Sequence, residues 1–214
     1  MKFEISDFKH GIFDVEGTLI DNKRVYRWLV SKISLALEPN GSELFLPAGG
    51  VPLPGWAKLF RQSQTLTRIS LIAERKILTL LDLLDKKDSK LFEGSKEVLF
   101  KLKQKGILLF ATTGSKTEKA ISMLKRAGIL EFFTLITGSE LPKKEHVKLF
   151  AQRVNLPLDD FCKKTFLVSD GPVDLNLAAK NKIYGIGFAS TFKAEYLFRS
   201  GAKQVISNLK ELIQ

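Results

Sequence analysis

Two carboxylates near the N-terminus have the clearest chemical potential in this 214-residue sequence. Asp14 and Glu16 stand two positions apart after the apolar pair Ile12-Phe13, and Gly17 and Thr18 follow them. Side chains two apart on a strand point to the same side, so both carboxylates can face one pocket at the strand's carboxyl end. Two carboxylates in a small space repel each other and need a cation or a shared proton. The alternative is a solvated acidic turn, and this stretch alone does not decide between the two.

Three other apolar segments are also followed by polar side chains. Hydroxyls follow the run 107–111, two lysines follow the segment 132–137, and two aspartates follow the segment 165–169. These residues are Thr112, Thr113 and Ser115, then Lys143 and Lys144, then Asp170 and Asp174. The loops after the strands of a parallel sheet meet at one edge, so we expect this set to gather there.

Carboxylates, hydroxyls and a lysine are typical of a site for magnesium and phosphate. Magnesium prefers oxygen ligands, and phosphate oxygens accept bonds from hydroxyls, lysine and backbone N–H groups at a helix start. Each residue has another explanation: Thr112 could cap the next helix, the lysines could be surface residues, and the aspartates could form a turn and a cap. Their joint occurrence at strand ends favours a site. Histidine is not expected to take part, because His10 precedes the first strand and His146 lies within a helix, and this argues against zinc.

The elements that must position these residues alternate between strand and helix from residue 91 onward. Strands are predicted at 107–111, 132–137, 165–169 and 184–188. Helices are predicted at 95–105, up to 127, at 145–154, at 175–180 and at 205–213. This order predicts an α/β fold with a doubly wound parallel sheet. Residues 22–90 are predicted to be all-helical, inserted after the first strand of a core formed by residues 1–21 and 91–214.

The composition predicts a cytoplasmic protein without a membrane segment. No run of 18 apolar residues occurs, the N-terminus does not resemble a secretory signal, and the single cysteine, Cys162, excludes an intrachain disulfide. The net charge of +11 could indicate a nucleic-acid partner. However, the lysines are spread along the chain without a dense basic block, which favours a solvated surface. A positive field would also attract small phosphorylated anions.

The sequence resembles the haloacid dehalogenase (HAD) superfamily of hydrolases over essentially its whole length. Residues 14–21, Asp-Val-Glu-Gly-Thr-Leu-Ile-Asp, match the first motif of that family, usually D-x-D-G-T-[LV]-x-D. Thr112 matches the second motif, and Lys143 fits the third, with Lys144 a close competitor. The insertion at 22–90 falls where phosphoglycolate-phosphatase-like members carry a small helical cap.

The fourth motif of the family is similar to Asp170-x-x-x-Asp174, although Ser169 stands where glycine is common. The resemblance implies that Asp14 attacks phosphorus and forms an aspartyl-phosphate. It also implies a Mg²⁺ ion held by Asp14, the backbone carbonyl of Glu16 and Asp170, with Asp174 as a further ligand or a support.

Two further roles follow from the same resemblance. Lys143 would neutralise charge on the phosphoryl group, and Thr112 would bond one of its oxygens. The expected substrate-binding residues are Thr18, Thr113 and Gly114 in the core and Arg61 and Arg68 in the insertion. For each arginine taken singly, a solvent-facing helix residue is the favoured interpretation.

Glu16 departs from the family pattern. The residue two after the nucleophile protonates the leaving oxygen and then activates water, and most phosphatases of the superfamily have Asp there. The Glu side chain is longer by about 1.5 Å, and such a change in the position of the acid–base carboxylate is enough to alter the catalytic rate. Dehalogenases have Tyr and phosphonatases Ala at this position, so both chemistries are disfavoured.

The sequence therefore predicts a magnesium-dependent phosphatase for a small phosphorylated metabolite, acting as a monomer or homodimer. A phosphomutase would use the same residues. A HAD-fold binding or regulatory protein with weakened catalysis is the alternative from another class, since fold does not fix function. A nucleic-acid-binding module has the least support, because no aromatic-basic patch is present.

Overall fold

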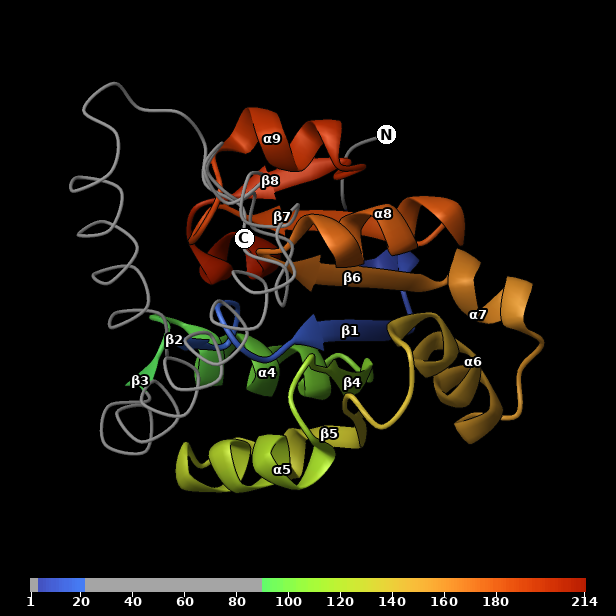
Figure 1. Cartoon of the computed structure of the whole chain (residues 1–214), viewed down its shortest axis with the longest axis horizontal. Helices are drawn as coiled ribbons and strands as arrows, with labels where there is room; N and C mark the ends of the chain where they lie inside the picture. The colour runs from blue at the N-terminus through green and yellow to red at the C-terminus, as the bar shows by residue number, and fades with distance from the viewer. Residues whose placement is uncertain (1–3, 22–89) are drawn as a thin grey trace, which may run out of the picture. The chain divides into compact units, whose positions relative to one another are not determined.

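Six parallel strands form the sheet that carries the predicted site residues (Figure 1). The computed structural model describes residues 4–21 and 90–214. Within them the strand order is β5-β4-β1-β6-β7-β8, so the chain winds outward from β1 in both directions. The strands are β1 (His10–Asp14), β4 (Leu108–Thr112), β5 (Phe133–Thr137), β6 (Thr165–Ser169), β7 (Tyr184–Phe188) and β8 (Gln204–Ile206). The predicted α/β class with a doubly wound parallel sheet is confirmed.

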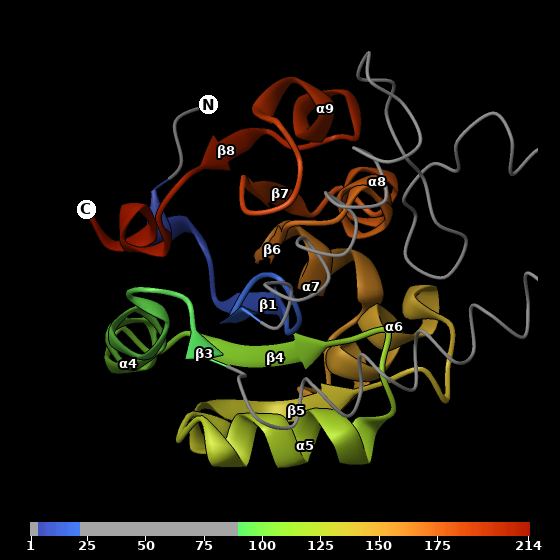
Figure 2. The same ribbon diagram turned by 60° about the vertical axis from the view of Figure 1, so that its left-hand side comes forward.

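Helices cover both faces of this sheet (Figure 2). They are α4 (Ser95–Gln104), α5 (Thr117–Arg126), α6 (Lys143–Arg153), α7 (Leu158–Lys163), α8 (Pro172–Lys180) and α9 (Ala194–Arg199). Short 3-10 helices lie at η1 (Ile5–Asp7), η2 (Leu130–Phe132) and η3 (Leu209–Ile213). Neighbouring side chains of β1 pack on opposite faces of the sheet. Phe13 lies in the apolar cluster under α4, α5 and η3, and Ile12 lies in the cluster under α6 and α7. The strands are therefore apolar on both sides, as their continuous apolar runs predict.

The strands were predicted more accurately than the helices. Two of them, 165–169 and 184–188, have the predicted bounds, and the strands near 107 and 132 differ by one residue at their ends. The first strand begins at His10, which was placed before it. The predicted helix at 205–213 is wrong, because residues 204–206 pair with β7 and the short helix η3 begins only after Asn208, whose side chain caps it. The helices α7 and α9 were missed.

A two-stranded antiparallel ladder joins the two described segments of the chain. β2 (Ile20–Asp21) pairs with β3 (Lys90–Leu91), with Ile20 opposite Leu91 and Asp21 opposite Lys90. Residues 1–21 and 90–214 belong to one compact unit. Apart from Lys90, the helical insertion predicted for residues 22–90 lies outside the described residues and stays a prediction.

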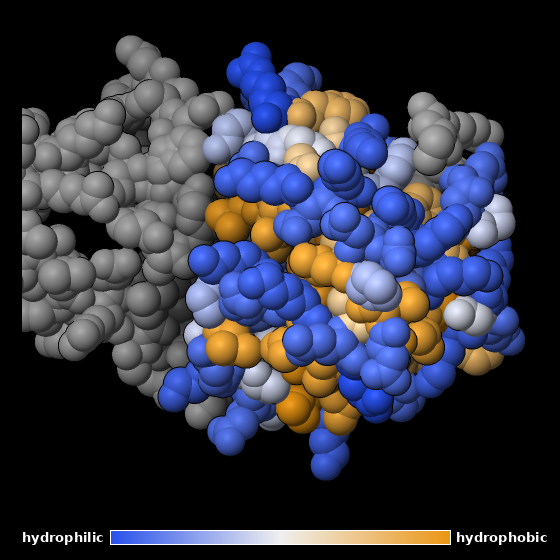
Figure 3. All heavy atoms as spheres, turned by 90° about the vertical axis from the view of Figure 1, so that its right-hand side faces the viewer, coloured by the Kyte–Doolittle hydropathy of each residue, from blue (hydrophilic) through white to orange (hydrophobic). Residues whose placement is uncertain are grey.

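The surface of the core carries hydrophilic side chains in many places. On the face shown in Figure 3 they lie between smaller hydrophobic areas and are not collected in one region. This distribution agrees with the even spread of lysines along the sequence. Among the described residues, no helix is both long and apolar enough to span a membrane.

Candidate active site

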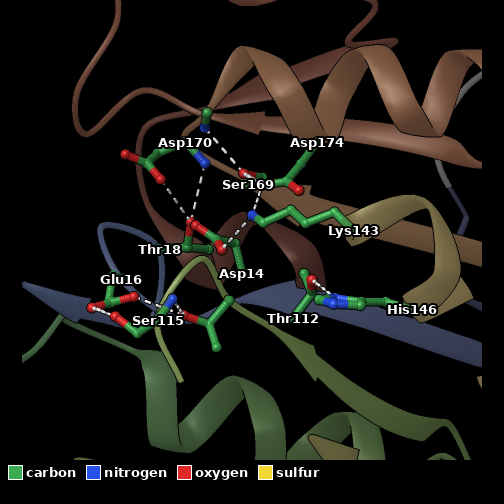
Figure 4. A network of polar contacts seen from close by, with 12 residues as sticks. Asp14, Glu16, Thr18, Thr112, Ser115, Lys143, His146, Ser169, Asp170 and Asp174 are labelled. Carbon is green, nitrogen blue, oxygen red and sulfur yellow. Dashed lines mark hydrogen bonds and ion pairs between the residues drawn. The ribbon is translucent and has the colours of Figure 1, made fainter. Parts of the chain in front are cut away.

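The polar residues predicted to meet at one edge of the sheet do lie together there (Figure 4). Asp14, Thr112 and Ser169 are the last residues of β1, β4 and β6, and Asp14 pairs directly with Thr112. The chain then turns at Gly17, whose φ of +84° lies in the left-handed region that glycine adopts without strain. The fold thus delivers three polar side chains from separate parts of the sequence to one place.

Lys143 joins two of the carboxylates. Its Nζ lies 3.2 Å from Oδ1 of Asp14 and 2.7 Å from Oδ2 of Asp174. Burial by itself would lower the pKa of Lys143, but the charges and hydrogen bonds of Asp14 and Asp174 outweigh it and raise the pKa well above its ordinary value. The ammonium therefore stays charged. Lys144, the other lysine that the sequence left open, is exposed.

Asp170 is held by the loops that follow β1 and β7. Its carboxylate accepts bonds from the hydroxyls of Thr18, at 3.2 Å, and Thr191, and its backbone N–H donates to the Thr18 hydroxyl at 3.0 Å. Ser190 donates to the carbonyl of Gly17. Thr18 was expected to bind substrate, but it is fully buried and its hydroxyl fixes Asp170. Ser190 and Thr191 were not identified from the sequence.

Ser169 supports Asp174. Its hydroxyl donates to Oδ2 of Asp174 at 2.9 Å and accepts the N–H of Gly171 at 3.0 Å. The serine that replaces the family's glycine is therefore part of the site. The other oxygen of Asp174, Oδ1, is buried and has no hydrogen-bond partner among the described residues.

The Glu16 carboxylate faces the loop after β4. Its Oε2 accepts from the Thr113 hydroxyl at 2.7 Å, and its Oε1 accepts from the Ser115 hydroxyl at 2.8 Å. In Figure 4 the Glu16 carboxylate lies beside Ser115, apart from the Asp14–Lys143–Asp174 cluster. Thr113, which was expected to bind substrate, is fully buried, and Gly114 is exposed.

Thr112 contacts a histidine that the sequence analysis set aside. Nδ1 of His146 lies 2.8 Å from the Thr112 hydroxyl, and its Nε2 lies 2.9 Å and 3.0 Å from the carbonyls of Gly138 and Leu141. Thr112 does not cap the next helix, because α5 begins at Thr117 with Lys116 at its N-cap. The expectation that histidine has no part in these contacts is wrong. One signal was available: His146 is three residues after Lys143, which places both on neighbouring positions of a helix surface.

The sequence pattern of haloacid dehalogenase-like hydrolases matches residues 11–188. The chain belongs to this family. The match includes every strand end, loop and helix start from Asp14 to Asp174 that carries the site, so the resemblance noted from the motifs is confirmed. A search of curated proteins found no match.

Solved structures of HAD proteins share the fold over nearly the whole chain. A haloacid dehalogenase-like protein of unknown function from Agrobacterium tumefaciens is 20% identical, with a TM-score of 0.68 and 96% of each chain covered. A predicted phosphoglycolate phosphatase from Haemophilus somnus is 16% identical, with a TM-score of 0.64 and 97% of each chain covered. A candidate β-phosphoglucomutase from Thermotoga maritima is 16% identical, with a TM-score of 0.66, covering 96% of this chain and 97% of that one. At identities this low, the structural similarity shows a common fold and nothing further.

The acidic residues of this HAD site fit a magnesium ion. Among residues 4–21 and 90–214, no three His, Cys, Asp or Glu side chains form a metal cage made of protein alone. Magnesium does not need one, since it commonly takes one or two carboxylates together with water and phosphate oxygens. The buried Oδ1 of Asp174, without a hydrogen-bond donor, adds an oxygen atom suited to a cation.

Two predicted substrate-binding residues of the HAD chain fall in the insertion. Arg61 and Arg68 lie outside the described residues, and their role stays a prediction. The other residues named from the sequence all lie in the loops or strand ends at the carboxyl edge of the sheet, or at the start of α6 and α8.

Proposed function

We propose that this HAD-family protein is a magnesium-dependent phosphatase that hydrolyses a small phosphorylated metabolite in the cytoplasm. The observation that carries the proposal is the position of Lys143 between Asp14 and Asp174 at the carboxyl edge of the sheet. A fixed cation beside a carboxylate nucleophile suits the transfer of a negatively charged phosphoryl group. The fixed ammonium therefore suits a negatively charged substrate such as a phosphate ester.

Asp14 is the nucleophile in this proposal. One of its oxygens forms a bond to phosphorus while the bond from phosphorus to the leaving oxygen breaks, which leaves an aspartyl-phosphate. Glu16 gives a proton to the leaving oxygen and becomes a carboxylate. Glu16 then takes a proton from water as the water oxygen bonds to phosphorus and Asp14 departs, so both side chains return to their starting states.

Lys143 and the metal share the charge on the phosphoryl group. The Lys143 ammonium donates to Oδ1 of Asp14, and Thr112 lies at the end of the adjacent strand. Asp14, Asp170 and the backbone carbonyl of Glu16 would hold the Mg²⁺ ion, with Asp174 as a further ligand or a support. When bound, the ion supplies Lewis-acid stabilisation of the negative charge.

A phosphomutase is the second candidate function. It is favoured by the candidate β-phosphoglucomutase among the similar folds and by a residue set that serves either reaction. The two differ in the acceptor of the phosphoryl group, which is water in a phosphatase and a sugar hydroxyl in a mutase. A protein that binds phosphate without turnover is the third case, and Glu16 in place of the usual Asp is its only support.

Phosphate release from a panel of phosphorylated metabolites, with and without Mg²⁺, tests the proposal. The wild type is expected to release phosphate and the Asp14→Asn variant to lose that activity by at least about a thousandfold, since the nucleophile is removed. Isomerised sugar phosphate without free phosphate would support the mutase instead. A wild type that gives neither product would overturn both.

A further inference from the structure

The two hydroxyls that bind Glu16 hold the proposed acid–base residue in one orientation. The Thr113 hydroxyl donates to Oε2 and the Ser115 hydroxyl donates to Oε1, so both carboxylate oxygens are engaged from the same loop. The Thr113 oxygen also accepts the N–H of Ser115 at 3.0 Å. Its one proton is therefore directed at Glu16.

The loop that carries these hydroxyls is itself fixed. The N–H of Thr113 donates to the carbonyl of Thr137 on β5, and the Ser115 carbonyl accepts the N–H of Ser139. Gly138 packs directly against this loop, because a Cβ there would lie 2.3 Å from the backbone nitrogen of Thr117. The donors are thus attached to the sheet and are not on a loose surface turn.

A glutamate needs such contacts more than an aspartate does. Glu has one more rotatable bond, so its carboxylate has more orientations to lose when it takes up a position beside a substrate. Two hydrogen bonds from a fixed loop remove that freedom before substrate arrives. In the proposed phosphatase, these two hydrogen bonds offset the extra conformational freedom of the longer residue.

We propose that Thr113 and Ser115 are positioning residues for Glu16 and act on the protonation of the leaving group. This inference rests on the proposed phosphatase function, because it concerns the residue that gives the leaving oxygen its proton. Thr113 was expected from the sequence to bind substrate, and this proposal assigns it instead to the support of Glu16. Neither hydroxyl needs to touch the substrate.

The test uses two esters that differ in their need for a proton. Phenyl phosphate has a poor leaving group that depends on a general acid, whereas 2,4-dinitrophenyl phosphate has a leaving group stable enough to depart as an anion. The ratio kcat/KM is measured with Mg²⁺ for both esters, because it reports on the steps up to the first phosphoryl transfer. Ser115→Ala removes one hydroxyl and keeps the backbone N–H that Thr113 accepts.

The expected result is a loss confined to phenyl phosphate. Both hydroxyls stabilise the carboxylate that forms as Glu16 gives up its proton. Ser115→Ala and Thr113→Val should therefore each lower kcat/KM for this ester about tenfold, the approximate value of one hydrogen bond to that charge, and change it by less than about twofold for the dinitrophenyl ester. Thr113→Ser restores the hydroxyl and should restore the phenyl phosphate rate. Glu16→Gln should show the same selectivity with a larger loss, which identifies the residue through which the hydroxyls act.

Three outcomes decide the matter. Equal losses for the two esters, or no loss for either, would overturn the positioning role and leave the phosphatase proposal in place. A wild type that hydrolyses neither the two esters nor any metabolite would overturn the phosphatase proposal and the inference with it. Thermal melting of each variant shows whether a loss for both esters comes from unfolding, and Ser115→Ala decides the inference if Thr113→Val does not fold.

Discussion

Thr112 and His146 form a buried pair at the edge of the site, with the threonine hydroxyl 2.8 Å from Nδ1 of the imidazole. The other ring nitrogen faces two backbone carbonyls, which only accept hydrogen bonds, so it must carry the proton. Burial lowers the pKa of His146 despite those carbonyls and favours the neutral ring. Nδ1 is then an acceptor, and the Thr112 hydroxyl donates to it.

This pair predicts different effects for two substitutions of His146. Asn places an oxygen near the position of Nδ1 and can still accept the Thr112 proton, whereas Gln reaches the position of Nε2 and leaves that proton free for a phosphate oxygen. We expect His146→Gln to strengthen the binding of inorganic phosphate by up to about tenfold, the value of roughly one hydrogen bond, and His146→Asn to stay close to the wild type. Inhibition constants for phosphate measure both. Weaker binding by His146→Gln would show that the imidazole orients the hydroxyl toward phosphate and does not compete for its proton.

The two adjacent lysines provide a matched pair for the anion site. Lys143 contacts both Asp14 and Asp174, whereas Lys144 is exposed. Lys143→Met keeps the length of the side chain and removes its charge, so kcat/KM for any phosphate ester should fall by at least about a hundredfold. Lys144→Met should stay within about twofold of the wild type, because an exposed lysine contributes little. Similar losses in both variants would mean that the overall positive field, and not the fixed ammonium, attracts the substrate.

The sequence predicted the site residues that belong to strand ends and missed those that act through a second residue. Asp14, Thr112 and Asp170 could be found because each follows an apolar run at a predictable place. Thr191 could not, because its contact with Asp170 joins two loops that are 21 residues apart and carry no pattern. His146 was recognised as helical, but nothing in its spacing showed that its ring reaches the end of β4.

The same limit applies to the elements of the fold. Continuous apolar runs predicted the inner strands, whose bounds are set by burial on both faces. β8 is a three-residue strand at the outer edge of the sheet, and a stretch that short is too small to show a period of two. α7 and α9 have six residues each and give no helical repeat for the same reason.

Removal of the metal should abolish activity if Mg²⁺ shares the phosphoryl charge. Treatment with EDTA is expected to lower the rate by at least about a hundredfold, and added Mg²⁺ should restore it. Asp170→Asn should move half-activation to Mg²⁺ concentrations about ten to a hundred times higher, since a carboxylate ligand is replaced by a neutral amide. The control is Asp159→Asn, an exposed acid at the start of α7. Full activity in EDTA would exclude a metal from the reaction.

The two buried histidines should make the protein less stable in mild acid. Burial lowers the pKa of His10 despite a backbone hydrogen bond with Phe161, and burial lowers that of His146 as well. The unfolded chain therefore binds more protons than the folded one below about pH 6.5, the ordinary pKa of histidine. The contribution of both residues is complete above that pH and is lost as the pH falls below it, by at most about 1.4 kcal/mol per pH unit for each.

Urea unfolding at about pH 7.5 and about pH 5.5 measures this loss, in a range where ordinary carboxyl groups stay ionised. The wild type should have a smaller free energy of unfolding at the lower pH. The double variant His10→Gln/His146→Gln should show a much smaller difference between the two pH values, although its stability at the higher pH is lower because buried contacts of both rings are lost. If the double variant keeps the full difference, other groups cause it, and neither imidazole has a lowered pKa in the folded protein.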